Sequence, residues 1–153
     1  MSTVALPVDR QPVTIVIAGD PIAKGRPRMT RKGFVYTPAQ TRKYEAHGRL
    51  AAQQAMGDRP PIATPVRVVV LIELPVPASW SRKRAAAALV GDIRPTTRPD
   101  LDNYLKGALD AINSIVVVDD SLVVEVDAQK RYATQPKLEV SIIPLAAEPG
   151  ARR

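Results

Sequence analysis

The chain has 153 residues, of which 45% are hydrophobic and only 4% aromatic, so its size and composition suit one folded domain with an aliphatic core. It carries 22 Lys and Arg residues against 15 Asp and Glu residues, and this net charge of +7 favours a polyanionic partner such as a nucleic acid. Cysteine is absent and histidine occurs once, which excludes disulfides, thiolate nucleophiles and His-rich metal sites within one chain. Any chemistry must therefore rely on carboxylates, lysine, hydroxyl groups and a hard metal ion.

The two ends of the chain differ in composition from its middle. Residues 1–12 are polar and contain proline, and residues 146–153 end in two arginines, so we expect a flexible N-terminal arm and a disordered C-terminal tail around a folded domain at 13–145. No apolar run reaches the length of a membrane span, and the first thirty residues lack the hydrophobic core of a signal peptide. We therefore expect a cytoplasmic protein without a membrane partner.

A strongly basic segment follows the first expected strand, residues 13–18. Between Asp20 and Glu45 the sequence has no acidic residue, and glycines and a proline interrupt any helix, so the segment is expected to form a loop or an irregular hairpin. Its candidate DNA-binding residues are Lys24, Arg26, Arg28, Arg31 and Lys32. We interpret the segment as a clamp on DNA phosphates; the alternative is a solvated loop that is basic only for solubility.

The middle of the chain predicts a helix, a central strand and a short basic helix. A helix is expected from about Pro38 to Met56, and the nearly continuous apolar run at 66–74 predicts a strand in the centre of a sheet. Residues 79–89 predict a short helix whose first turn holds Arg82, Lys83 and Arg84. Cations at a helix start oppose the helix dipole, so we assign them to phosphate contact. Trp80 is expected to cover an edge of the core, although it has the chemistry to stack on an unpaired base.

The segment at 98–112 carries the densest group of candidate functional residues. Pro99 and Asp100 predict a helix start, and the apolar residues Leu101, Leu105, Ala108, Leu109 and Ile112 share one helical face that we expect to be buried. Asp102, Lys106 and Asp110 recur at four-residue steps on another face. This pattern is also ordinary helix design, because an acidic first turn suits the dipole and Asp102 can pair with Lys106.

A second acidic pair, Asp119 and Asp120, follows an apolar run. We expect this turn to approach the helix start and to bring three or four carboxylates together, where mutual repulsion calls for Mg²⁺ or Mn²⁺. The two strands expected at 122–130 and 137–143 are predicted to pair with each other through a turn around Pro136.

Several of these motifs together resemble the RusA family of Holliday-junction-resolving endodeoxyribonucleases, which are common in phages and prophages. The resemblance rests on the segments at 19–28, 77–84, 99–106, 109–111, 118–121 and 130–132, and it spans roughly residues 13–143. Asp-x-Asp-Asn-x-x-Lys followed within about twenty residues by Asp-Asp is a specific combination, whereas each piece alone is weak. Tyr104 stands where leucine is common in the family, a change that leaves the other assignments intact.

The resemblance implies a fold, an activity and a set of roles. The fold is an α/β (α+β) domain in which a mixed sheet packs against two main helices. The activity is Mg²⁺-dependent nicking of opposed strands of a four-way DNA junction by a homodimer, in recombination and repair at the nucleoid. Asp100, Asp102 and Asp120 would bind the metal, Lys106 would contact the scissile phosphate or the attacking hydroxide, and Asn103 and Asp119 would support them.

Two alternatives belong to other functional classes. A non-catalytic nucleic-acid-binding protein would need only the basic charge, with the aspartates serving as helix caps. A phosphohydrolase for free nucleotides would need a compact Gly-rich phosphate loop, and none of the eight glycines forms such a pattern.

Overall fold

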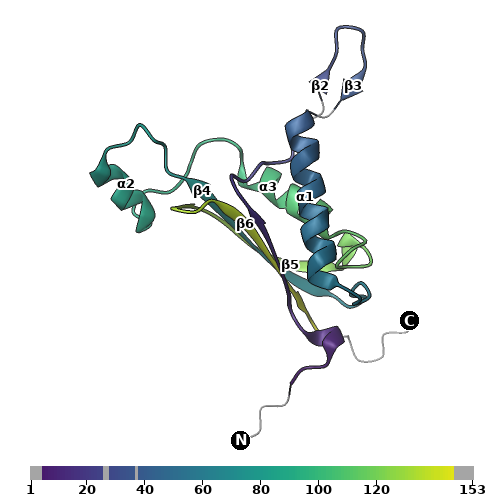
Figure 1. Ribbon diagram of the computed structural model, residues 1–153. Helices are drawn as coiled ribbons and strands as arrows, with labels where there is room; N and C mark the ends of the chain where they lie inside the picture. The colour runs from purple at the N-terminus through teal and green to yellow at the C-terminus, as the bar shows by residue number, and fades with distance from the viewer. Residues whose placement is uncertain (1–4, 26–27, 37, 147–153) are drawn as a thin grey trace, which may run out of the picture.

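The computed structural model describes residues 5–25, 28–36 and 38–146, which form a mixed four-stranded sheet with helices on one side (Figure 1). The strand order is β1-β6-β4-β5, where β1 is Val13–Ala18, β4 is Val66–Pro75, β5 is Val123–Ala133 and β6 is Lys137–Pro144. β4 pairs parallel to β5 and antiparallel to β6, and β6 pairs antiparallel to β1. The predicted central position of β4 is confirmed.

Two helices, α1 (Ala39–Met56) and α3 (Leu101–Ile112), cover the same face of the sheet. α1 packs on β1 and on α3, and α3 packs on β4 and β5. The two helices approach closely at Gly48, where an added Cβ would lie 3.2 Å from Ile17 Cδ1 and 3.3 Å from Ala111 Cβ. The absence of a side chain at Gly48 therefore lets α1 sit close to both neighbours.

Residues of the strands alternate between the core and the opposite face of the sheet. The buried positions form an aliphatic core, in which Ile15, Val68, Val70, Ile72 and Ile142 are nearly inaccessible. The alternate positions carry polar cross-strand pairs, such as the hydroxyl groups of Thr14 and Ser141 at 3.4 Å and the ion pair of Arg67 with Asp127 at 3.7 Å. This alternation is the two-residue period of a sheet with one covered face.

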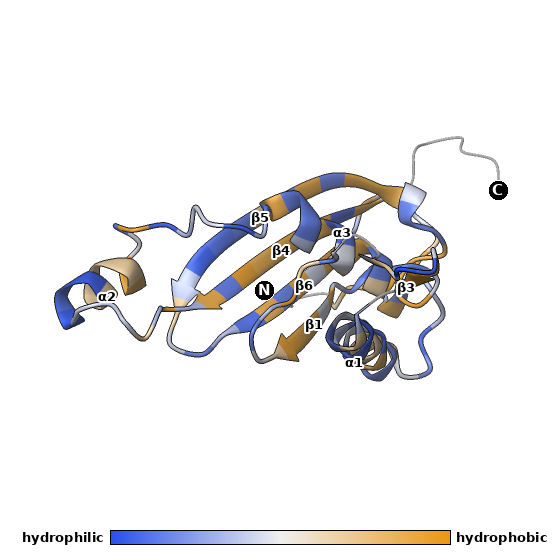
Figure 2. Ribbon diagram, turned by 90° about the horizontal axis from the view of Figure 1, so that it is seen from above, coloured by the Kyte–Doolittle hydropathy of each residue, from blue (hydrophilic) through white to orange (hydrophobic). Residues whose placement is uncertain are grey.

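Several smaller elements extend this framework. β2 (Arg28–Met29) and β3 (Val35–Tyr36) form a hairpin that projects away from the body beyond the start of α1 (Figure 1). α2 (Arg82–Leu89) lies apart from the other helices, at one end of the sheet (Figure 2). Short 3-10 turns, η1 (Val8–Arg10) and η2 (Asp120–Leu122), precede β1 and β5.

The single α+β domain, with its mixed sheet and two main helices, is as expected, but the pairing of the last two strands is not. β5 and β6 do not pair with each other, because β4 lies between them. The short link from Ala133 to Lys137 is long enough, at roughly 3.5 Å per residue, to cross the end of one intervening strand. β4 has the longest uninterrupted apolar run of the strands, residues 68–72, so it gains most by having both of its edges covered.

The buried face of α3 is also rotated from the predicted one. Tyr104, Ala108, Ala111 and Ile112 are buried, while Leu101 is exposed and both Leu105 and Leu109 are only partly buried. The helix therefore turns Tyr104 inward and leaves its first residues in solvent.

Parts of the two terminal segments lie within the structure. η1 belongs to the expected N-terminal arm and contacts β6, whereas residues 1–4 and 147–153, on which the rest of the arm and most of the tail were predicted, lie outside the described residues. Within the described ranges, no helix combines the length and apolarity that crossing a bilayer requires.

Candidate active site and DNA interface

The start of α3 exposes the two carboxylates of the predicted Asp-x-Asp motif. Asp100 is the N-cap residue and Asp102 lies in the first turn, and both side chains are exposed. The Asp100 side chain accepts no capping hydrogen bond from the described part of the chain, so the expected capping role is not seen and its oxygens remain available to a ligand. The two carboxylates thus present unshared oxygen atoms at the positive end of the helix.

The loop that leads into α3 is fixed by a lysine from the sheet. Lys130 Nζ donates hydrogen bonds to the main-chain carbonyls of Thr97 and Pro99, both at 3.1 Å. Pro99 follows a cis peptide bond and directly precedes Asp100. Lys130 belongs to a motif that carried the family resemblance, but no role could be assigned to it from the sequence. Its contacts identify it as a positioning residue for the start of α3.

Lys106 lies one turn after Asp102 and is exposed, so the ammonium and the carboxylate share the solvent side of α3. Asn103 is half-buried, and its main-chain carbonyl accepts a hydrogen bond of 3.2 Å from the Lys24 amide. The contact of Asn103 is therefore made by its backbone, and it joins α3 to the base of the basic hairpin. Sequence patterns do not reveal this kind of main-chain contact.

The second acidic pair lies at the other end of α3, which corrects the expectation that it would approach the helix start. The Asp120 amide donates to Asn113 Oδ1 at 3.0 Å, and Asn113 is the C-cap of α3. Because α3 has 12 residues and rises about 1.5 Å per residue, roughly 18 Å separates this cap from Asp100. Within one chain, Asp120 is therefore remote from the Asp-x-Asp motif.

Asp119 has a local structural role in the same turn. Its carboxylate accepts a hydrogen bond of 3.1 Å from the Ser121 amide and caps η2. Hydrogen bonds from the hydroxyl and then the amide of Ser121 lower the pKa of Asp119. Asp119 thus stays ionised and shapes the turn that presents Asp120.

The positions of these aspartates determine whether one chain alone can hold the predicted metal ion. Among residues 5–25, 28–36 and 38–146, no three His, Asp or Glu side chains come together in a group that could hold a metal. A single chain supplies the pair Asp100 and Asp102. An Asp120 carboxylate at the same site would have to come from a second chain.

The predicted DNA-binding residues of the hairpin fall into three groups. Arg31 and Lys32 are exposed at its tip. Lys24 Nζ pairs with the Asp110 carboxylate of α3, so the ammonium is directed onto the protein. Arg26 and the side chain of Arg28 lie outside the described residues.

The other predicted cations lie at the start of α2, where the Ser81 hydroxyl accepts a 3.2 Å hydrogen bond from the Arg84 amide. Arg82 and Lys83 are exposed. The guanidinium of Arg84 lies 3.9 Å from the ring centroid of Trp80. The Trp80 and Tyr132 rings pack edge to face, with their centroids 5.3 Å apart. Trp80 therefore covers an edge of the core, as expected, and attaches α2 to β5.

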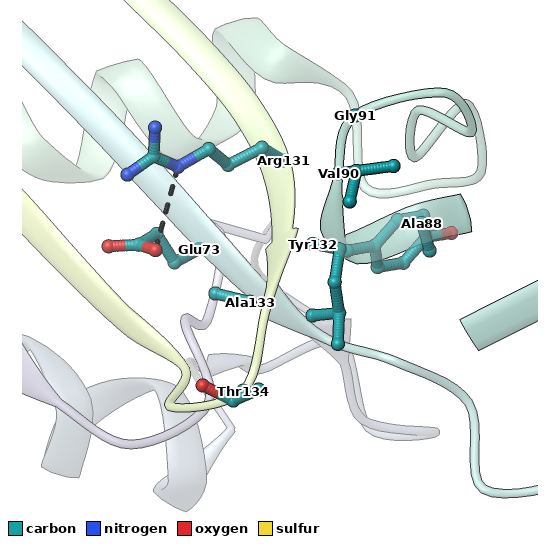
Figure 3. Close-up of a pocket in the computed structure, with 9 residues that line it drawn as sticks. Glu73, Ala88, Val90, Gly91, Arg131, Tyr132, Ala133 and Thr134 are labelled. Atoms are coloured by element: carbon teal, nitrogen blue, oxygen red, sulfur yellow. Dashed lines mark ion pairs between the residues drawn. The ribbon is translucent and has the colours of Figure 1, made fainter. Parts of the chain in front are cut away.

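A pocket between α2 and the end of the sheet was not anticipated. It has a volume of about 420 Å³, and Figure 3 shows Glu73, Arg131 and Tyr132 on the sheet side and Val90 and Gly91 on the α2 side. Glu73 is only 8% exposed and pairs with Arg131 at 3.5 Å and Lys137 at 3.6 Å. The sequence signal for this pocket was Glu73 itself, which is the lone acidic residue in the apolar run at 66–74.

Comparisons with known proteins agree with the resemblance. The family model described as Endodeoxyribonuclease RusA matches residues 18–143. An uncharacterised protein of Bacillus subtilis strain 168, YqaN, is 38% identical over 142 residues, which cover 88% of this chain and 98% of YqaN. The match extends from β1 to β6 and includes the Asp-x-Asp motif, the hairpin and α2. The chain is a member of the RusA endodeoxyribonuclease family.

Proposed function

We propose that this protein is a divalent-metal-dependent, structure-specific endodeoxyribonuclease that resolves Holliday junctions by paired nicks, in recombination and repair at the nucleoid of a bacterium or of a phage-infected cell. The observation that carries the proposal is the exposed Asp100, Asp102 and Lys106 at the start of α3, in a chain of the RusA family. The net charge of +7 supports a DNA partner.

The chemistry assigned to the chain's own residues is simple. Asp100 and Asp102 supply hard oxygen ligands suited to Mg²⁺ or Mn²⁺, and Lys106 orients the scissile phosphate by charge attraction. A divalent ion held by these carboxylates would supply charge neutralisation at the phosphoryl group and activation of the attacking water. Lys130 holds the loop before Asp100, so the ligands are positioned before DNA arrives.

A homodimer is part of the proposal, because in one chain Asp120 lies at the opposite end of α3 from Asp100. β5 is an edge strand of 11 residues, and the exposed fractions of its Val124 and Val126 are 60% and 44%. A long, apolar edge strand favours pairing with a second copy. A two-fold pair also suits the chemistry, since two opposed strands have to be cut.

Antiparallel pairing of β5 with its copy supplies the missing carboxylate. In the register that sets Val124 against the partner's Val126, the start of β5 runs toward the partner's Lys130, and Asp120 lies in the 3-10 turn just before that start. Lys130 contacts the carbonyl of Pro99, next to Asp100. Each site would then combine Asp100, Asp102 and Lys106 of one chain with Asp120 of the other.

Mixed dimers provide the test. Asp102→Asn and Asp120→Asn should each abolish Mg²⁺-dependent nicking of a four-way junction and keep junction binding. When the two variants are unfolded and refolded together, about half of the dimers should be mixed and have one intact site and one doubly altered site. Those dimers should nick one strand of a junction without completing resolution.

Two other outcomes would contradict parts of the proposal. Mixtures that remain inactive while each variant still binds junctions would place all three aspartates of a site in one chain and exclude the shared site. Binding by the wild-type protein without any cleavage in Mg²⁺ or Mn²⁺ would favour a non-catalytic DNA-binding protein.

A further inference from the structure

The tip of the β2–β3 hairpin exposes an unusual amount of apolar surface. Phe34, the only phenylalanine of the chain, is 69% exposed, and Met29 is 70% exposed. An aromatic ring in water leaves a large apolar area without a partner. Aromatic residues make up only 4% of this chain, so an exposed one is unexpected. Arg31 and Lys32 are exposed between these two residues in sequence. Apolar groups and cations thus share one projecting tip.

The turn that carries Phe34 is closed by three hydrogen bonds. The Gly33 amide donates to the Thr30 carbonyl at 3.0 Å, the Thr30 amide donates to the Phe34 carbonyl at 2.8 Å, and the Phe34 amide donates to Thr30 Oγ1 at 3.1 Å. Gly33 has a φ of 84°, which a three-residue hairpin loop requires at its last position. The Phe34 backbone is therefore fixed, while its ring remains in solvent.

The hairpin separates its side chains onto two faces. Met29 pairs with Val35 across the strands, and the next pair outward is Thr30 with Phe34. Because neighbouring residues of a strand point to opposite faces, Phe34 and Val35 lie on different faces of the hairpin. The chain thus offers a matched control within one residue of Phe34.

The segment before the hairpin is attached to the helix of the candidate active site. The Lys24 amide bonds to the Asn103 carbonyl, Lys24 Nζ pairs with Asp110, and an added Cβ at Gly107 would lie 3.8 Å from Lys24 Cβ. Two contacts and close packing therefore hold Lys24, four residues before β2, against α3. The segment that leads into the hairpin is thus anchored on the helix that carries Asp102.

We propose that Phe34 is a wedge that stacks against an unpaired or unstacked base at the branch point of the DNA, with Arg31 and Lys32 on the flanking phosphates. This inference rests on the proposed function and specifies how the same site recognises its substrate. DNA is the occupant that fits, because the apolar ring is flanked by cations and followed by no acid until Glu45. Exposed Phe and Met side chains insert between base steps in proteins that kink DNA, and aromatic rings stack on single bases.

The wedge can be tested separately from cleavage by using the binding-competent, uncleaving Asp102→Asn protein with a junction that carries 2-aminopurine at its branch point. Binding should change the fluorescence of the probe as Phe34 alters its stacking. Adding Phe34→Ala should abolish the change and weaken junction affinity about tenfold, with little effect on a linear duplex. Phe34→Trp should restore both, and Val35→Ala should leave both unchanged.

Several results would overturn the wedge. An unaltered fluorescence change and junction affinity in Phe34→Ala would remove Phe34 from recognition, as would an equal effect of Val35→Ala. A shift of the DNA-free Phe34→Ala protein to a smaller assembly would show that the ring contacts a second copy of the chain. A normal wedge signal in a wild-type protein that cuts nothing would instead refute only the nuclease proposal.

Discussion

The main-chain amide of Lys24 donates a 3.2 Å hydrogen bond to the main-chain carbonyl of Asn103, and this contact joins the segment before the basic hairpin to the helix that carries Asp102. The Lys24 side chain reinforces it by pairing with Asp110. A residue predicted to bind DNA therefore has its charge paired with a carboxylate of the same chain.

Salt dependence should separate Lys24 from the cations at the hairpin tip. Replacing Arg31 or Lys32 with alanine should reduce the slope of log junction affinity against log salt concentration by about 0.9 each, since each removes one phosphate contact. Lys24→Met should leave the slope unchanged. Its cost in stability should be below about 1 kcal/mol, because the side chains of the pair are 40% and 39% exposed. A reduced slope in Lys24→Met would restore Lys24 to the DNA-binding set.

Lys130 should matter for catalysis without touching DNA. Lys130→Met removes the donor to the Thr97 and Pro99 carbonyls and frees the loop before Asp100. Misplacement of the proposed metal ligands should lower the nicking rate about 10- to 100-fold, while junction affinity stays within about twofold. The same change at exposed Gln129, the preceding residue, should leave the rate unaltered. Equal losses in both variants, measured by single-turnover cleavage, would contradict the positioning role.

A charge on the free edge of β5 should break the proposed dimer. Val126→Lys places an ammonium in the pairing edge and should give a monomer by light scattering, with loss of cleavage. Val16→Lys is the matched control, because Val16 is similarly exposed, at 47%, on β1 at the opposite edge of the sheet. In the proposed register Glu125 meets its own copy, so Glu125→Gln should tighten the dimer. A dimeric Val126→Lys protein would exclude pairing through this edge.

Glu73 should contribute to stability more than other acidic residues of the sheet. Its carboxylate is largely buried between Arg131 and Lys137, and Glu73→Gln leaves two neighbouring cations without their counter-charge. The free energy of unfolding should fall by about 1–3 kcal/mol in urea titrations. Glu139→Gln, on the neighbouring strand β6, should change it by less than about 0.5 kcal/mol. Comparable losses in the two variants would show that burial of Glu73 is not the cause.

The amino-acid sequence determined the elements and the family. Proline, glycine and capping residues delimit α1, α2 and α3 within a few residues of their observed ends, and the apolar run of β4 indicated its central place. These features depend on local backbone preferences and on periodicity, which a sequence displays directly. The Asp-x-Asp-Asn-x-x-Lys motif likewise identified the family, because its residues are close together in sequence.

Only the tertiary structure decided which of these pieces meet. β5 and β6 both have the alternating pattern of strands and are linked by a short turn, so the sequence predicts that they pair with each other. In the fold each of them instead pairs with one edge of β4. The direction of α3 along the sheet sets Asp120 at its far end and Lys130 at its start, which no spacing rule reveals. Contacts between distant segments are set by packing of the whole core, so the separation of Asp120 from the Asp-x-Asp motif within one chain emerged from the fold alone.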